Sequence, residues 1–251
     1  MIKLEHTEVT GWEATIRGMR NPMNSWDKSD SGIGYISKDD REDGSIRTFS
    51  DESPRNDFWI GPADQDLMMR LARAGSVDAK YRRMINVTVD ITAPFYWWKE
   101  FDTYKVGTVA NSCSTMHKIH AKEFTLDDFS YEHLDEEPIR VTWDNQYYED
   151  TALDHLKDTI GLLNAYRDKF LETKDKKYWW QMIQLLPTSY NQKRTVQLNY
   201  EVLAGIYPKR KNHKLDEWHV FCDWIKALPY SKIITLEGIF YDVHWNEASQ
   251  K

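Results

Sequence analysis

Cysteine, excess basic charge and long apolar runs are scarce or missing in this sequence of 251 residues. Two cysteines, Cys113 and Cys222, are too few for a disulfide framework, so a reduced intracellular protein is the simpler interpretation. The formal net charge of −7 disfavours a nucleic-acid binder, because that function needs a concentrated basic surface. There is no run of about 18 apolar residues and no signal-peptide core, so we expect a cytoplasmic protein with no membrane partner.

The common catalytic and metal-binding motifs are missing too: there is no P-loop, no glycine-rich dinucleotide motif, no HExxH and no CxxC. His117 and His120 could share a helix face, but ordinary surface histidines are favoured, so we predict no metal site. Cys113 could be a nucleophile beside a base, although a free cysteine is more often an inert small hydrophobe. The basic run at residues 209–214 could bind a phosphate or form a solvated turn, and its composition favours neither.

Aromatic side chains are abundant instead, with 11 Trp and 14 Tyr. Four aromatics follow one another at residues 95–98, directly after Pro94. Trp and Tyr combine a large apolar area with a polar group, so they suit cores, subunit interfaces and planar ligands alike. For residues 95–98, packing in the core or at a subunit contact is favoured over stacking on a flavin or a base.

Hydrophobic periodicity predicts one α+β domain spanning residues 1–251, with helices dominant. Alternation predicts strands at residues 2–9 and 84–92, and a short one before Trp143. The predicted helices and helical turns lie at residues 11–20, 61–74, 78–83, 125–129, 151–171, 176–185, the later part of 194–207 as far as Pro208, and 215–228. Residues 21–58 should form an irregular loop region with at most a short hairpin near residues 33–36, and residues 230–251 should form a C-terminal tail.

Two blocks of residues carry a resemblance to a known family. The first runs from Ala93-Pro94 through the aromatic residues and Tyr104-Lys105-Val106 to Asn111-Ser112-Cys113-Ser114-Thr115-Met116-His117. The second contains Leu186-Pro187, then Asn199 at the start of a helix, then Arg210 one helix length later. In this order they resemble the flavin-dependent thymidylate synthases, whose signature is Arg-His-Arg-x-x-Ser-x-Asn-Glu-x-Ser-x-Arg-Tyr. The order of elements fits over residues 61–229, and the match is sharp only in the two blocks.

Several signature positions are altered, and each lost charge-assisted contact weakens ligand binding by about 1.5–3 kcal/mol. Thr103 or Tyr104 replaces the first Arg of the signature and the His after it, and Lys105 is the candidate for the second Arg. Ser112 replaces the Glu, and Met116-His117 replaces the Arg-Tyr pair. The Arg expected just before Leu-Pro is replaced by Ile183 or Gln184. Candidates to restore positive charge are Lys99, Arg194, Lys209 and His117. The pattern indicates a divergent branch of the kind associated with phage and prophage genomes.

The resemblance implies a fold, a reaction and a set of site residues. The fold is a central antiparallel sheet flanked by helices, assembled as a homotetramer that binds FAD at subunit junctions. The reaction methylates dUMP or a related pyrimidine nucleotide, with methylenetetrahydrofolate as methyl donor and NADPH as reductant. The implied residues are Arg210 as the catalytic group that polarises the pyrimidine; Glu100, Lys105, Ser112 and Ser114 in substrate binding; and Tyr104, Lys105, Asn111, Asn199 and Glu201 in cofactor binding.

Three alternatives stay open. Asn199 either lies near the flavin or caps the helix that follows it. The protein could be a homologue that binds a nucleotide or flavin without transforming it. It could also be a structural or interaction protein that uses the aromatic helix as an interface, in which case no nucleotide or flavin would shift its melting temperature.

Overall fold

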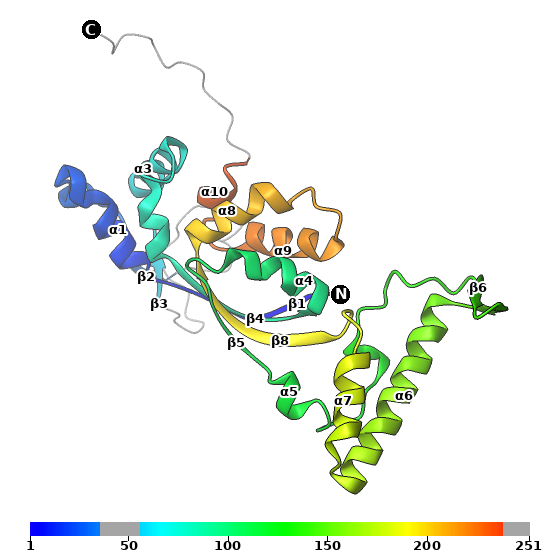
Figure 1. Cartoon of the computed structure of the whole chain (residues 1–251). Helices are drawn as coiled ribbons and strands as arrows, with labels where there is room; N and C mark the ends of the chain where they lie inside the picture. Colours follow the sequence, from blue (N-terminus) through cyan, green and yellow to red (C-terminus); the bar gives the residue numbers. More distant parts are fainter. Residues whose placement is uncertain (36–55, 238–251) are drawn as a thin grey trace. The chain divides into compact units, whose positions relative to one another are not determined.

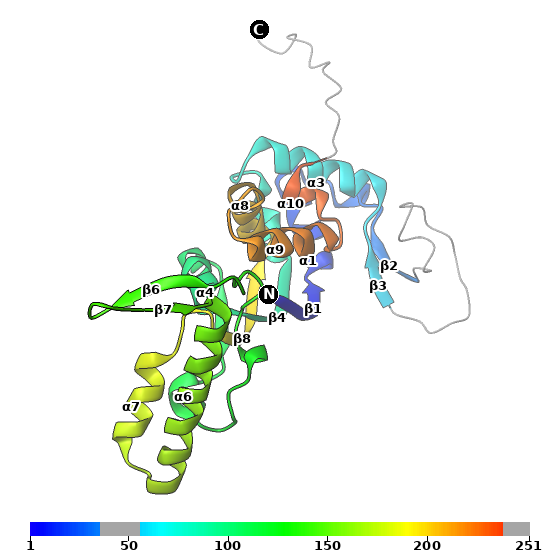
Figure 2. The same ribbon diagram turned by 90° about the vertical axis from the view of Figure 1, so that its right-hand side faces the viewer.

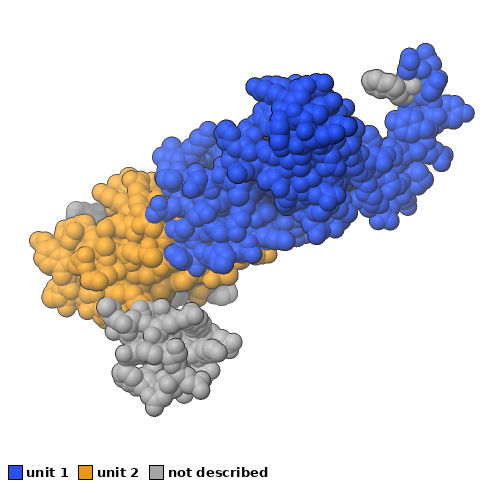
Figure 3. Space-filling view, turned by 90° about the horizontal axis from the view of Figure 1, so that it is seen from below, with its two compact units in different colours: residues 1–8, 88–198, 213–221 blue, residues 9–87, 199–212, 222–251 orange. Residues whose placement is uncertain are grey.

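The computed structural model describes residues 1–35 and 56–237, which form two compact units coloured separately in Figure 3. The single domain expected for residues 1–251 stays a prediction. The segments of unit 1 are Met1–Glu8, Thr88–Leu198 and His213–Phe221; those of unit 2 are Val9–Val87, Asn199–Asn212 and the chain from Cys222 onward.

A four-stranded sheet supplies the main layer of unit 1 (Figure 1). In spatial order its strands are β1 (Lys3–Thr10), β4 (Asn86–Pro94), β8 (Asn191–Asn199) and β5 (Val109–Ser112). β5 pairs with β8 in the antiparallel sense, and its other side is an edge of the sheet. The predicted α+β class and the antiparallel sheet flanked by helices are confirmed.

The sequence of β4 explains why the chain is extended there. The side chains of Val87, Val89, Ile91 and Ala93 are completely buried, and those between them are half-buried. This period of two places one row of side chains against the core, as β geometry requires. The strand predicted at residues 84–92 lies two residues too early, because Met84 still belongs to a 3₁₀ helix.

The aromatic helix α4 (Phe95–Phe101) packs against the first turns of α9 (Asp216–Ala227). Trp97 and Trp98 are at most 1% exposed, and the ring centroids of Trp97 and Trp218 lie 4.8 Å apart. Large aromatic rings supply much of a core's apolar area, so this cluster holds α4 and the start of α9 together. The interpretation of residues 95–98 as packing residues is therefore confirmed for its two tryptophans.

A helical hairpin and a β-hairpin complete unit 1. The remaining elements are η4 (Asp102–Tyr104), α5 (Thr115–Lys118), η5 (Leu126–Asp128), β6 (Ile139–Trp143), β7 (Gln146–Asp150), α6 (Ala152–Thr173) and α7 (Lys176–Leu185). α6 and α7 lie side by side in Figures 1 and 2, with Leu156, Ile160 and Leu163 packed against Met182. The sequence predicted both helices but only one of the two paired strands, β6 and β7.

Unit 2 is built mainly from short helices. Its elements are α1 (Trp12–Arg20), η1 (Asn21–Met23), η2 (Trp26–Lys28), β2 (Gly32–Tyr35), β3 (Asn56–Trp59), α3 (Pro62–Ala74), η3 (Ala79–Met84), α8 (Tyr200–Arg210) and α10 (Lys232–Thr235). α10 contacts both α3 and α8. At the position of the short hairpin predicted near residues 33–36, β2 instead pairs in the antiparallel sense with β3, at the other end of the predicted loop region. Residues 36–55 of that region lie outside the described residues.

The predicted end of α8 is wrong, because the helix continues through Pro208 to Arg210. A proline removes its own backbone hydrogen bond and disfavours a helical conformation of the preceding residue. Here the proline lies in the last turn, and the backbone N–H of Lys211, directly after the helix, still bonds to the carbonyl of Tyr207 at 3.0 Å. Tyr207 is also buried, so packing keeps it helical.

α10 lies at the start of the segment expected to be a tail. Its backbone carbonyl at Ile233 accepts a hydrogen bond from Nη1 of Arg82, 3.1 Å away. None of the helices in the described ranges, 1–35 and 56–237, has the length and apolar character that crossing a membrane requires.

Candidate functional site

The predicted site residues of unit 1 lie on residues 100–114, which leave α4 and return as the edge strand β5. All four residues of β5 are exposed, and they include Asn111 and Ser112. In the register with β8, Asn111 is opposite Thr195 and Ser112 is opposite Arg194. Directly opposed residues in an antiparallel pair share a face of the sheet. Asn111 therefore lies on one face of the edge and Ser112 on the other.

The fold makes no use of the polar groups that this segment presents. Among the described residues, the side chains of Lys105, Asn111, Ser112 and Ser114 make no hydrogen bond or ion pair. All four are exposed. An ammonium group, an amide and two hydroxyl groups are thus available to a ligand on one short segment of chain.

Gln192 fastens the end of this segment to β8. Its Nε2 donates to the carbonyl of Cys113 at 3.0 Å and to Oγ1 of Thr115 at 3.1 Å. The backbone N–H of Cys113 donates in turn to the carbonyl of Lys193 at 3.0 Å. Ser114, between the two fastened residues, is therefore held at a defined place beside the sheet.

The face of the sheet that carries Asn111 is rich in carboxylates. Asp90 accepts hydrogen bonds from Oγ1 of Thr195 at 2.6 Å and pairs with Nζ of Lys193 at 3.1 Å. These two contacts hold the pKa of Asp90 below its usual range, so it is ionised at neutral pH. Lys193 also lies 3.6 Å from Glu5. One ammonium against two carboxylates makes this face unfavourable for an anionic group.

Glu100 and Tyr104 both contact Trp218 at the start of α9, and Glu100 also approaches His213 before that helix. Oε2 of Glu100 accepts from the indole N–H of Trp218 at 3.0 Å and lies 3.4 Å from Nε2 of His213. The ring of Tyr104 meets that of Trp218 edge-on, with centroids 6.1 Å apart. The structure thus gathers these two predicted residues around Trp218, whereas Ser112 and Ser114 lie beside β8.

In unit 2 the predicted residues belong to the start and end of α8. Oδ1 of Asn199 accepts from the backbone N–H of Val202 at 3.1 Å, which confirms the capping alternative. Glu201 pairs with Nε of Arg82 at 2.8 Å, and that arginine side chain is only 7% exposed. Arg210 is the last residue of the helix.

The histidine and cysteine hypotheses have separate outcomes. α5 ends at Lys118, so His117 and His120 do not share a helix, and the His120 ring packs edge-on against Phe170. In residues 1–35 and 56–237, no group of three or more His, Cys, Asp or Glu side chains could hold a metal ion. Cys113, the candidate nucleophile, is exposed, and its role stays a prediction. The other cysteine, Cys222, is buried, and burial raises the pKa of its thiol to about 11, which keeps it protonated at neutral pH.

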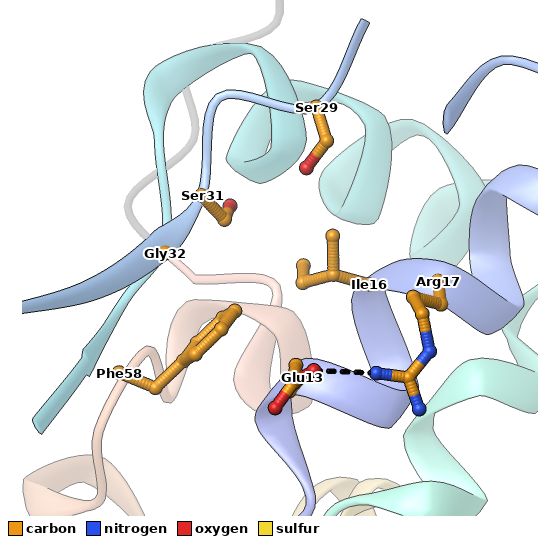
Figure 4. Close-up of a pocket in the computed structure, with 7 residues that line it drawn as sticks. All are labelled: Glu13, Ile16, Arg17, Ser29, Ser31, Gly32 and Phe58. Atoms are coloured by element: carbon orange, nitrogen blue, oxygen red, sulfur yellow. Dashed lines mark hydrogen bonds and ion pairs between the residues drawn. The ribbon is translucent and has the colours of Figure 1, made fainter. Parts of the chain in front are cut away.

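Unit 2 also has a cleft of about 270 Å³ that sequence reasoning missed (Figure 4). It is lined by Glu13, Ile16, Arg17, Ser29, Ser31, Gly32 and Phe58. The Arg17 guanidinium pairs with Glu13 at 2.6 Å, and both serine hydroxyls donate to the buried carboxylate of Asp64. The polar side chains that line this cleft thus already have partners within the fold, and no predicted site residue lines it.

No protein-family model and no curated protein matches the sequence. Solved structures do match its fold. A thymidylate synthase X (ThyX) from Helicobacter pylori with FAD and dUMP aligns with a TM-score of 0.60 at 15% identity, over 94% of this chain and 98% of that one. A second structure of the same enzyme, complexed with FAD and dUMP, aligns with a TM-score of 0.58 at 16% identity, over 94% of this chain and 97% of that one.

A third match is a UMP/dUMP methylase, PolB from Streptomyces cacaoi bound with 5-Br UMP. Its TM-score is 0.54 at 12% identity, over 94% of this chain and 95% of the methylase. The chain has the fold of the flavin-dependent thymidylate synthases. This ThyX-like fold was predicted from the two residue blocks, and the match extends along nearly the whole length of both partners. Membership of a phage or prophage branch stays a prediction.

Proposed function

We propose that this ThyX-like protein is a flavin-dependent methyltransferase that acts on dUMP or a related pyrimidine nucleotide. The observation that carries the proposal is the fold, shared over 94% of the chain with a structure that holds FAD and dUMP. The likeness to a UMP/dUMP methylase supports the same class of substrate. The exposed polar groups of residues 105–114, which the fold leaves without partners, support a ligand site on this segment.

The residues of unit 1 fit a phosphorylated ligand. Phosphate oxygens are acceptors and bind best to charged or hydroxyl donors. In the proposed site Ser112 and Ser114 donate to the nucleotide phosphate, Lys105 adds a positive charge, and Asn111 offers its amide to the cofactor. Glu100 and Tyr104 border the site at the start of α9. FAD, when bound, would supply the redox chemistry, with NADPH as reductant and methylenetetrahydrofolate as methyl donor.

The residues of α8 have two kinds of role in this proposal. Arg210 provides a fixed positive charge that stabilises negative charge developing on the pyrimidine carbonyl. Asn199 and Glu201 act indirectly, because the first caps the helix and the second ties it to Arg82. Both contacts fix the helix that ends at Arg210. A homotetramer that shares its sites between subunits is part of the proposal.

Spectroscopy and turnover test this function directly. The purified protein, incubated with FAD and then desalted, should keep the flavin absorbance bands. With dUMP, NADPH and methylenetetrahydrofolate it should form dTMP, and Arg210→Ala should abolish product while leaving the flavin bound. Colourless protein that forms no product would defeat the proposal.

The altered signature favours a second candidate, a homologue that binds a pyrimidine nucleotide without methylating it. Several arginines of the family signature are replaced here, which lowers the positive charge available to a nucleotide phosphate. In that case FAD or dUMP would raise the melting temperature, but no methylated product would form. A shift of the melting temperature combined with the turnover assay therefore separates the candidates.

A further inference from the structure

Arg194 on β8 is a cationic residue that lies opposite the segment of residues 105–114. It is opposite Ser112 in the register and shares its face of the sheet. The guanidinium carbon lies 4.1 Å from the centroid of the Trp98 ring. Nε donates to Oε1 of Gln192, and Nη1 pairs with Oδ1 of Asp102, each at 2.9 Å. The side chain is only 15% exposed, so stacking and hydrogen bonds fix its orientation.

The donors of Arg194 are only partly used within the described residues. A guanidinium has five N–H groups, and the contacts above engage two of them. Its carboxylate partner is much less enclosed, because the side chain of Asp102 is 43% exposed. An exposed carboxylate held by one hydrogen bond can be replaced by a phosphate, which carries more charge and accepts a bidentate pair from arginine.

A hydrogen-bond network links the guanidinium of Arg194 to the segment that carries the hydroxyls of Ser112 and Ser114. Arg194 bonds to Gln192, and Gln192 bonds to Cys113 and Thr115 on either side of Ser114. Ser112 shares its face with the guanidinium, whereas the opposite face of the strand pair carries carboxylates. The Ser112 face is therefore the electrostatically favourable one for a phosphate.

We propose that Arg194 is the phosphate-binding arginine of this chain, held in the ligand-free protein by Asp102. The phosphate of a pyrimidine nucleotide displaces the carboxylate and takes the guanidinium, together with the hydroxyls of Ser112 and Ser114. This inference rests on the proposed function and adds a residue to it. It also accounts for a chain that lacks several signature arginines and still binds a nucleotide phosphate.

Binding of dUMP and of deoxyuridine to the full-length protein, measured by titration calorimetry, tests the inference. Arg194→Gln should weaken dUMP binding by about 10- to 100-fold and leave deoxyuridine binding unchanged, since a charged hydrogen bond to phosphate is lost. The dUMP affinity of Arg194→Lys should fall between those of wild type and Arg194→Gln. Asp102→Asn should tighten dUMP binding several-fold, because it removes the competing anion.

Arg167 provides a matched control in the same unit. Its guanidinium is also largely buried, pairs with Asp168 and donates to a backbone carbonyl, but it belongs to α6. Arg167→Gln should therefore leave dUMP affinity unchanged. If Arg194→Gln does not fold, Asp102→Asn and Arg194→Lys decide the question, because both keep a positive charge at residue 194.

The outcomes distinguish this inference from the proposed function. Wild-type affinity for dUMP in Arg194→Gln, or an equal loss for deoxyuridine, would overturn the role of Arg194 while leaving the nucleotide site in place. Weaker dUMP binding in Asp102→Asn would overturn the displacement. A wild-type protein that binds no pyrimidine nucleotide would overturn both.

Discussion

Polar side chains serve different ends in two regions of the molecule. In unit 2 two buried arginines are used by the fold: Arg20 pairs with Asp64 at 2.6 Å, and Arg82 pairs with Glu201 at 2.8 Å. In residues 105–114 of unit 1, the exposed ammonium, amide and hydroxyl groups have no partner within the described chain. The first arrangement contributes to stability, whereas the second leaves groups available to a ligand.

This contrast predicts which variants should affect stability and which should affect binding. A buried charge that loses its partner keeps its desolvation cost and destabilises the fold. An exposed polar group that is removed costs the fold almost nothing, because water was its partner. A variant in unit 2 and a variant on residues 105–114 should therefore give opposite results in unfolding and binding experiments.

The largest effect is expected at the buried pair of unit 2. Arg20→Gln leaves the carboxylate of Asp64, which is completely buried, without its positive partner. We expect the free energy of unfolding to fall by about 3–5 kcal/mol, measured by urea denaturation. The hydroxyls of Ser29 and Ser31 still donate to that carboxylate, so we expect a loss in the lower part of this range.

Arg17 on the same helix provides the control. It pairs with Glu13, and both side chains are more than 60% exposed. Arg17→Gln should change the free energy of unfolding by about 0.5 kcal/mol or less, because exposed pairs are screened by water. Equal effects of the two arginine variants would contradict the distinction between buried and exposed pairs.

The pH dependence of stability tests the buried carboxylate of Asp64 in a second way. Burial alone would raise the pKa of the Asp64 carboxyl, but hydrogen bonds from Ser31, Ser29 and Arg20 outweigh it and hold that pKa below its ordinary value of 3.8. A depressed pKa in the folded state contributes stability above the ordinary value, and this contribution disappears as the pH falls through the folded-state pKa.

The free energies of unfolding of wild type and Asp64→Asn should therefore converge as the pH falls from about 5 toward the folded-state pKa of Asp64. Chemical denaturation at a series of pH values measures this. A difference between the two proteins that stays constant below the ordinary value of 3.8 would show that Asp64 gains no stability from being ionised.

A smaller effect is expected at the cap of α8. Asn199→Ala removes the acceptor for the backbone N–H of Val202 and should lower the free energy of unfolding by about 1 kcal/mol. Asn199→Asp keeps an acceptor and adds negative charge at the helix N-terminus, so its free energy of unfolding should stay close to that of wild type. Loss of bound FAD in Asn199→Ala without a loss of stability would instead support a direct cofactor contact.

Hydrophobic alternation and helical periodicity predicted many of the strands and helices, because both patterns depend only on residues that are close in the sequence. The alternation in β4 and the buried stripe of α6 are both visible in the sequence. The order of the two residue blocks predicted the ThyX-like fold, which the structural matches confirm. β7 was missed because its side chains are mostly exposed, so alternation between buried and polar positions is absent.

Long-range pairing could not be predicted from such patterns. Arg20 and Asp64 are 44 residues apart, and Arg82 and Glu201 are 119 apart, so no local spacing relates them. The contact of Arg194 with Asp102 spans 92 residues, although Arg194 was one of four candidates to restore positive charge. Glu201 was predicted to bind a cofactor, and only the structure shows that its carboxylate pairs with Arg82.

The smallest effect on stability is expected where the proposed effect on binding is large. Ser112→Ala and Ser114→Ala remove exposed hydroxyls that have no partner in the described chain. The free energy of unfolding should stay within about 0.5 kcal/mol of wild type. The affinity for dUMP should fall roughly 10-fold or more for each, because a hydrogen bond to a charged phosphate is lost.

Thr142→Ala on β6 is the matched control, since Thr142 is another exposed hydroxyl of unit 1 without a partner among the described residues. It should change neither stability nor dUMP affinity. If the serine variants unfold as easily as Arg20→Gln, their hydroxyls serve the fold, and the distinction between the two regions fails. If they are stable and bind dUMP like wild type, the ligand site lies elsewhere. Only stable variants with weakened dUMP binding would place the phosphate on residues 112–114, because that result requires a group that the fold does not need and the ligand does.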